Sequence, residues 1–84
     1  MLDVNVVSRT ESIWSGTASL VAAPSIDGEI GILPGRQPLL AAMARGTVRV
    51  KNGDSLVKEV KVLRGLISVD SDMVTILIDE LDKN

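Results

Sequence analysis

The side chains that most often carry enzyme chemistry are missing from this chain, which contains no histidine and no cysteine. Without them it cannot build a Ser-His-Asp triad, a Cys-His pair or a zinc site with histidine ligands. Carboxylates remain, and a glycosidase needs only two Asp or Glu residues. Such an enzyme also needs a deep cleft, usually with aromatic platforms, and Trp14 is the only aromatic residue. We therefore expect no catalytic residue, no cofactor and no metal ion.

A glycine-containing segment, Asp27 to Gly35, is the next candidate, because glycine loops can cradle phosphate groups. Its glycines have neither the Walker A spacing nor that of a dinucleotide fingerprint, and no Lys-Ser or Lys-Thr pair follows them. Asp27 and Glu29, the two acids beside Gly28, are too few for a calcium loop. The spacing by itself predicts tight turns.

Three local features are candidates for contact with another molecule. Asp27-Gly28-Glu29 predicts an acidic loop tip, which is also the pattern of an ordinary surface turn. Arg36 lies between Pro34-Gly35 and Pro38, a stiff setting for a cation that meets a partner carboxylate, although a solvated arginine fits the same pattern. Trp14 fits a buried core position better than an interface hot spot.

Length and composition predict one small domain with an aliphatic core. Leu, Val and Ile make up 28 of the 84 residues, and without cysteine there is no disulfide. A chain this short is near the lower limit at which packing alone supports a fold, so a partner would add stability.

The charge pattern argues against a nucleic-acid partner. The formal net charge is −2, acidic and basic residues are interspersed, and aromatic residues for base stacking are lacking. The N-terminus lacks the pattern of a signal peptide, and no run approaches the ~18 apolar residues of a membrane span. We expect a soluble cytoplasmic protein with no direct membrane insertion, able to dock onto a membrane complex.

Segments of alternating apolar and polar residues recur between turn residues, which is typical of an all-β sandwich or barrel. Asn52-Gly53 predicts one tight hairpin turn, and Asp70–Asp72 predicts another. Leu56-Val57 interrupts the alternation, which predicts a bulge or burial on two sides. No segment predicts a long helix. The expected strands cover residues 2–6, 20–23 after a turn at Ser15-Gly16, 29–33, 38–43, 47–51, 56–63, 67–69 and 74–78. Residues 1–79 are assigned to the domain and 80–84 to a polar C-terminal tail.

The run Gly28–Gly35 (GEIGILPG), followed by Pro38-Leu39-Leu40 and Gly46–Val50 (GTVRV), resembles the N-terminal domain of bacterial F-type ATP synthase ε subunits in order and spacing. The resemblance covers nearly the whole chain, and the GEIGILPG and PLL segments are its specific part. Its flanking matches are Leu2-Asp3-Val4, Val6-Val7-Ser8, Trp14-Ser15-Gly16, Gly65–Val69 and Val74–Leu77. The resemblance implies a flattened antiparallel β-sandwich of about ten short strands.

The resemblance also implies a role without catalysis, in the central stalk (the rotor) of a proton-translocating ATP synthase. Such a subunit links the γ subunit to the membrane c-ring, within a complex that also holds α and β subunits, and couples proton flow to ATP synthesis. It lies peripherally, at the cytoplasmic face of the cell membrane. By the same resemblance, the expected c-ring contacts are Ile26, Asp27, Gly28 and Glu29, and the expected γ contacts are Ser8, Arg36, Leu39, Ala41 and Met43.

Two substitutions and one missing segment depart from the family pattern. Arg36 stands where many members have histidine, and Arg64 stands where the first glycine of a Gly-Gly pair is common. The chain stops near Leu81, without the C-terminal helical hairpin of most members. The sequence leaves open whether it is naturally short or a fragment. The alternative function is a free-standing β-sandwich module that binds a protein or a ligand.

Overall fold

The computed structural model describes residues 1–81, and all of its regular secondary structure is β-strand, as predicted. None of these residues belongs to a helix that is long and apolar enough to cross a membrane. The strands are β1 (Leu2–Ser8), β2 (Ser12–Ala18), β3 (Leu20–Ser25), β4 (Gly28–Ile32), β5 (Leu39–Met43), β6 (Gly46–Asn52), β7 (Ser55–Asp70) and β8 (Met73–Leu81).

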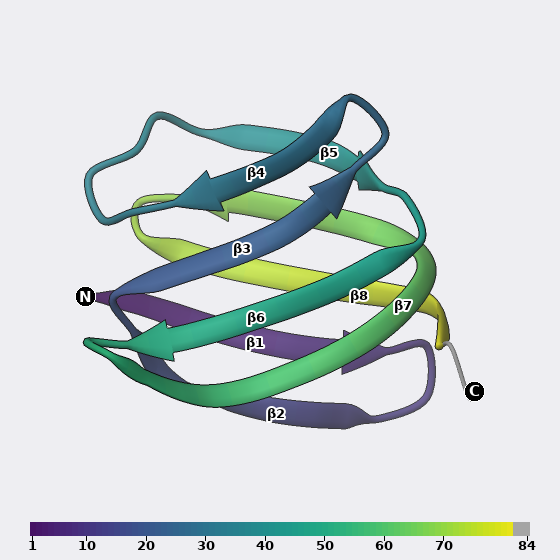
Figure 1. Ribbon diagram of the computed structural model, residues 1–84, viewed down its shortest axis with the longest axis horizontal. Coiled ribbons are helices and arrows are strands. Elements are labelled where there is room, and N and C mark those ends of the chain that lie inside the picture. The colour runs from purple at the N-terminus through teal and green to yellow at the C-terminus, as the bar shows by residue number, and fades with distance from the viewer. Residues whose placement is uncertain (82–84) are drawn as a thin grey trace.

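The strands form two layers that share β7 (Figure 1). In the first, which we call the β8 layer, β1 lies between β2 and β8, and the C-terminal half of β7 pairs with β8 and β5. In the second, the β6 layer, the N-terminal half of β7 pairs with β6, β6 pairs with β3, and β3 pairs with β4. The predicted β-sandwich is confirmed.

Strand β7 is 16 residues long and curves around one side of the molecule from the β6 layer to the β8 layer (Figure 1). Its pairing with β8 shifts register on both sides of Arg64, which marks a bulge where the strand bends. Gly65 follows the bulge. A Cβ built there would collide with the carbonyl oxygen of Leu77 and lie 2.8 Å from Cε of Met43, so the crossing needs a glycine.

The core lies between the layers and is aliphatic, as the composition predicts. Alternate residues of β1 point inward, so this strand contributes Leu2, Val4 and Val6. Among the described residues, Ser25 is the one buried polar residue. The other fully buried side chains include Val21, Ile32, Val48, Val50, Val62, Ile67, Val69, Val74, Ile76 and Ile78.

The strand count and the pairing differ in detail from the expectation of about ten antiparallel strands. The described residues form eight strands, because β7 serves both layers without a break. One pair is parallel: β1 and β8 run side by side from the pair Asp3 and Met73 to the pair Ser8 and Ile78. Strands from opposite ends of the chain need no hairpin between them, so nothing forces them to be antiparallel.

The turn expected at Ser15-Gly16 is wrong, because both residues lie inside β2. The segment from Leu20 is therefore the third strand and not the second. β2 is an edge strand with a mostly exposed, polar sequence, which hides the alternation of a strand. Gly16 leaves room for the indole ring of Trp14, because a Cβ at this glycine would lie 2.8 Å from ring atom Cζ2.

The hairpin predicted between β6 and β7 is confirmed, one residue further along the chain than expected. Asn52 pairs with Ser55, so Gly53 is the first turn residue, with a φ of 63°. The bulge predicted near Leu56 is also present. Val57 is the extra residue there, since the register shifts at this point.

The second predicted hairpin joins β7 to β8 through Ser71 and Asp72, whose φ values of 50° and 63° fit a primed turn. Strand β8 continues to Leu81, two residues beyond the predicted end of the domain. The division into residues 1–79 and a tail of 80–84 stays a prediction, and residues 82–84 of that tail lie outside the described residues.

Candidate protein-docking surface

The outward surface of the β8 layer carries apolar side chains across four neighbouring strands. The register places Val7 of β1 opposite Leu77 of β8. Leu77 lies opposite Leu66 of β7, which lies opposite Ala42 of β5. Leu66 is 45% exposed and Leu77 is 37% exposed. A sheet with one wet face normally presents polar side chains there, so these four residues, the apolar row, indicate a surface that a partner covers.

Leu40 adds to this surface from the next outward position of β5, where it is 72% exposed. It lies opposite Ser68, and Ser68 lies opposite Thr75. The layer thus presents the apolar row beside a second row that is polar except for Leu40. Together they form a mixed surface of the kind that protein interfaces use, with an apolar centre and polar groups around it.

The outward surface of the β6 layer is different. Arg49 and Glu59 form an ion pair there, with Nε 3.1 Å from Oε2. Leu56 is exposed on this surface as well, but Lys51 separates it from the half-buried Leu20 in the register. No continuous apolar row crosses the described strands of this layer.

The acidic tip predicted at Asp27-Gly28-Glu29 joins β3 to β4 and projects from one end of the molecule (Figure 1). All three residues are exposed, and Gly28 has a φ of 121° that favours glycine. Ser25 holds the turn from below, because its Oγ donates to the Gly28 carbonyl (2.5 Å) and accepts from the Asp27 N–H (3.2 Å). Ile26, also exposed, completes a tip that is fixed at its base and free at its surface.

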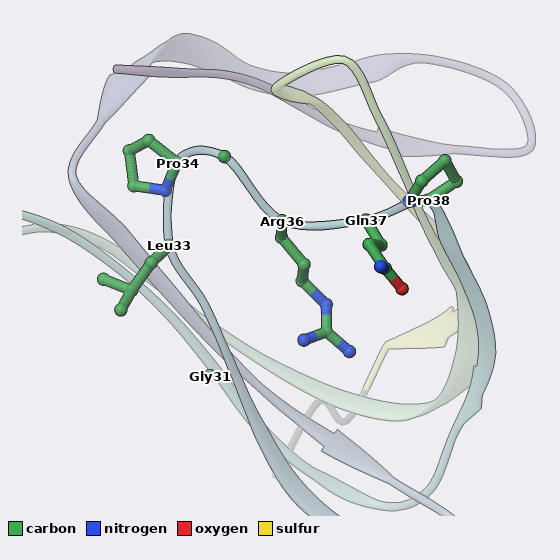
Figure 2. A pocket seen from close by; sticks show the side chains of 7 residues that line it. Gly31, Leu33, Pro34, Arg36, Gln37 and Pro38 are labelled. Carbon is green, nitrogen blue, oxygen red and sulfur yellow. The ribbon is translucent and has the colours of Figure 1, made fainter.

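The Arg36 corner lies at the opposite end of β4. Figure 2 shows Arg36 and Gln37 on the same side of the loop, over a hollow of about 390 Å³ that Gly31 also lines. The N–H of Gly35 donates to Oδ1 of Asp72 at 2.8 Å, which ties this loop to the β7–β8 turn. The predicted stiff presentation of Arg36 therefore has a structural basis in two prolines and one tertiary hydrogen bond.

The three β5 residues predicted to contact γ point toward the core. Met43 is only 3% exposed, and Leu39 and Ala41 pack against the buried cluster. Their neighbours Leu40 and Ala42 face outward. The predicted strand is therefore at the surface, and a partner that covers it would touch mainly the alternate side chains, Leu40 and Ala42.

Ser8 and Trp14 have local structural roles. Ser8 closes the β1–β2 turn: its Oγ accepts from the N–H of Glu11 at 3.2 Å and from that of Thr10 at 3.4 Å. Trp14 is partly buried and packs against the core. Its position is therefore intermediate between a buried core residue and an exposed interface residue. Among the described residues, no group of three or more Asp or Glu gathers as a metal site would require.

The apolar row was missed by reasoning from the sequence, although the sequence contains a signal for it. In a strand with one face on the core and the other face in water, apolar and polar residues alternate. Ile76-Leu77-Ile78 and Leu66-Ile67 are instead unbroken apolar runs. Such a run means that both faces of the strand are covered. In this domain the second cover is absent, and the run therefore points to an external partner.

This architecture defines a small β-sandwich domain with one apolar outer surface suited to binding another protein. Residues 1–83 match the family model described as the β-sandwich domain of the ATP synthase Delta/Epsilon chain, and the chain belongs to that family.

Among curated relatives, the chain is 47% identical over 75 residues to the ATP synthase epsilon chain of Micrococcus luteus, covering 89% of this chain and 82% of that one. It is 43% identical to the epsilon chain of Corynebacterium diphtheriae and 41% identical to that of Bordetella petrii, covering 90% and 93% of this chain. It spans only 63% and 55% of the length of these two relatives.

Two solved structures share the fold. One is the Euglena gracilis mitochondrial ATP synthase, OSCP/F1/c-ring, with a TM-score of 0.86 and 19% identity over 96% of this chain and 52% of that chain. The other is the central stalk/c-ring of the Tetrahymena thermophila mitochondrial ATP synthase, with a TM-score of 0.79 and 11% identity over 96% of this chain and 65% of that chain. At these identities the match supports the fold alone.

Proposed function

We propose that this chain is a non-catalytic rotor subunit of a proton-translocating F-type ATP synthase, which links the γ subunit to the c-ring. The names of its relatives and the central-stalk and c-ring assemblies that hold similar folds support this role. A chain without histidine or cysteine also suits a coupling role better than a catalytic one. In the complex, with α and β subunits present, the chain lies peripherally at the cytoplasmic face of the membrane.

The γ subunit covers the outward surface of the β8 layer in this proposal. The observation that carries it is the apolar row, because uncovered leucines in the middle of a sheet are the usual mark of an interface. Leu40 and Ala42 make the β5 contacts, while Leu39, Ala41 and Met43 support them from the core side. In the same proposal, Ser8 at the end of β1 and Arg36 in the loop before β5 contact γ at the margins of this surface.

The tip at Ile26, Asp27, Gly28 and Glu29 meets the c-ring. Its base adjoins the Ala42 end of the apolar row, because the N–H of Ile26 donates to the Ala42 carbonyl at 3.2 Å. The side chains of the tip and of the row are different, so one small domain can hold two partners at once. The exposed Ile26 supplies an apolar contact, and Asp27 and Glu29 pair with basic or amide side chains of the ring.

The test compares two leucines of the same strand with similar exposure. Leu66 (45% exposed) belongs to the apolar row, and Leu56 (49% exposed) lies in the β6-layer half of β7. A tagged chain with Leu66→Glu should recover at least tenfold less γ from solubilised membranes of its source, because a carboxylate would be buried in the contact, a cost of more than about 1.4 kcal/mol. The tagged chain with Leu56→Glu should recover as much γ as the unchanged chain, together with α, β and c subunits.

Mass spectrometry of the recovered proteins decides between the functions. If the unchanged chain brings down none of the ATP synthase subunits, the rotor proposal fails and the free-standing binding module replaces it. If both leucine variants lose γ equally, the chain still belongs to the rotor but the β8 layer is not its γ-binding surface.

A further inference from the structure

Two arginines converge on one carboxylate beside the apolar row. Nε of Arg64 lies 2.9 Å from Oδ2 of Asp79, and Nε of Arg9 lies 3.3 Å from Oδ1 of the same residue. These residues come from the bulge of β7, the end of β8 and the β1–β2 turn. Two arginines and one aspartate leave this group with one net positive charge, and both arginine side chains are largely exposed.

The arginines border a depression of about 430 Å³ at the place where β7 crosses between the layers. We call it the crossover pocket. Its mostly apolar lining is formed by Ala42, Met43, Gly65, Leu66 and Leu77, with Arg9, Arg64 and Asp79 at the rim. Three of the four residues of the apolar row thus line the pocket.

We propose that the crossover pocket receives an aliphatic side chain of the γ subunit that stands next to an Asp or Glu residue, whose carboxylate pairs with Arg9 and Arg64. This inference rests on the proposed function, and it names the chemistry that the partner must present. The apolar lining accounts for the aliphatic side chain, and the two exposed guanidinium groups account for the carboxylate.

Asp79 gives this arrangement its selectivity. By holding both guanidinium groups through Nε, it fixes them before the partner arrives, so less side-chain entropy is lost on binding. Guanidinium groups suit a carboxylate because their N–H groups match its two oxygens. A free inorganic anion would use the charge but leave the leucines in water, so a protein segment with both features fits the pocket better.

The β6 layer supplies a control. Arg49 is also a partly exposed arginine bound through Nε to a carboxylate, that of Glu59, but it lies far from the pocket. The experiment measures the affinity of the full chain for the purified γ subunit of the same source, by calorimetry at low and at physiological salt. It compares the unchanged chain, the double variant Arg9→Gln with Arg64→Gln, and Arg49→Gln.

We expect the double variant to bind γ at least tenfold more weakly at low salt, and its affinity to depend less on salt. Arg49→Gln should match the unchanged chain in both respects. Equal affinity and equal salt dependence for the double variant would overturn the inference and leave the proposed function intact. If the unchanged chain does not bind γ, both fail. Unchanged melting temperatures for all three proteins check that the comparison is between folded domains.

Discussion

A single glycine decides whether β7 can pass from one layer to the other. Gly65→Ala would push a methyl group against the carbonyl oxygen of Leu77 and against Met43. Because the first of these is backbone that cannot rotate away, we expect the free energy of unfolding to fall by about 1 to 3 kcal/mol, the usual cost of overpacking. Urea denaturation measures the change.

Gly31→Ala is the matched control. Gly31 also lies in a strand, but the nearest atom to its added Cβ would be a Leu20 methyl at 3.8 Å, an ordinary contact. The free energy of unfolding should change by less than about 0.5 kcal/mol. Equal effects of the two substitutions would mean that crowding at the crossing is not the reason for Gly65.

Charged residues show the limit of sequence reasoning at this scale. Arg9, Arg64 and Asp79 are far apart in the chain, and no spacing rule relates them. They meet because β1 pairs with β8 and β8 pairs with β7. In the same way, Leu39, Ala41 and Met43 were placed in the right strand, but the sequence did not show that their side chains pack toward the core. A run of five apolar residues does not specify which side is inward.

At the scale of the strands, the β3–β4 turn depends on one side-chain hydroxyl group, that of Ser25. Ser25→Ala would remove both the donor to the Gly28 carbonyl and the acceptor for the Asp27 N–H. We expect a loss of about 1 to 3 kcal/mol in unfolding free energy, because groups near a buried position are left without partners. Amide hydrogen exchange should also become faster at Asp27 and Gly28 than elsewhere.

Ser68→Ala provides the comparison for this element. Ser68 lies on the outward surface of β7, opposite Leu40 and Thr75. Its replacement should change the unfolding free energy by less than about 0.5 kcal/mol. If Ser25→Ala left both the stability and the exchange rates as they were, the hydroxyl would not be what holds the tip.

Most elements were predictable because their signals are local. Alternation identified the core side of β1 and β6, and Asn52-Gly53 identified a hairpin within one residue. The misplaced turn in β2 arose because an edge strand needs no apolar alternation. The parallel pairing of β1 with β8 could not be predicted from the sequence. Pairing between the two ends of a chain depends on how the whole sandwich closes, and no local sequence signal specifies it.

At the scale of the whole molecule, the two proposed contacts use different side chains, although they adjoin where the N–H of Ile26 donates to the carbonyl oxygen of Ala42 at 3.2 Å. The apolar row lies on the outward surface of one layer, and the acidic tip extends from one end of the other. Because the link between them is a backbone hydrogen bond, a side chain of either contact can be substituted on its own. The sequence located the tip, because glycine and acidic residues mark a turn wherever it occurs, but the row needed the register of four strands.

Glu29→Lys tests the tip on its own. Glu29 is exposed at the start of β4, and the described residues offer it no ion pair or side-chain hydrogen bond, so the substitution should change the unfolding free energy by less than about 0.5 kcal/mol. Reversing its charge against a basic or amide group of the c-ring should weaken attachment by about tenfold, or about 1.4 kcal/mol. Proton-driven ATP synthesis in membrane vesicles should fall, while recovery of γ in the pull-down stays normal.

Asp54→Lys makes the same charge change at the exposed β6–β7 turn, away from the tip, and should leave ATP synthesis unaltered. Normal ATP synthesis with Glu29→Lys would remove Glu29 from the ring contact, and an equal loss with Asp54→Lys would point to total charge as the cause.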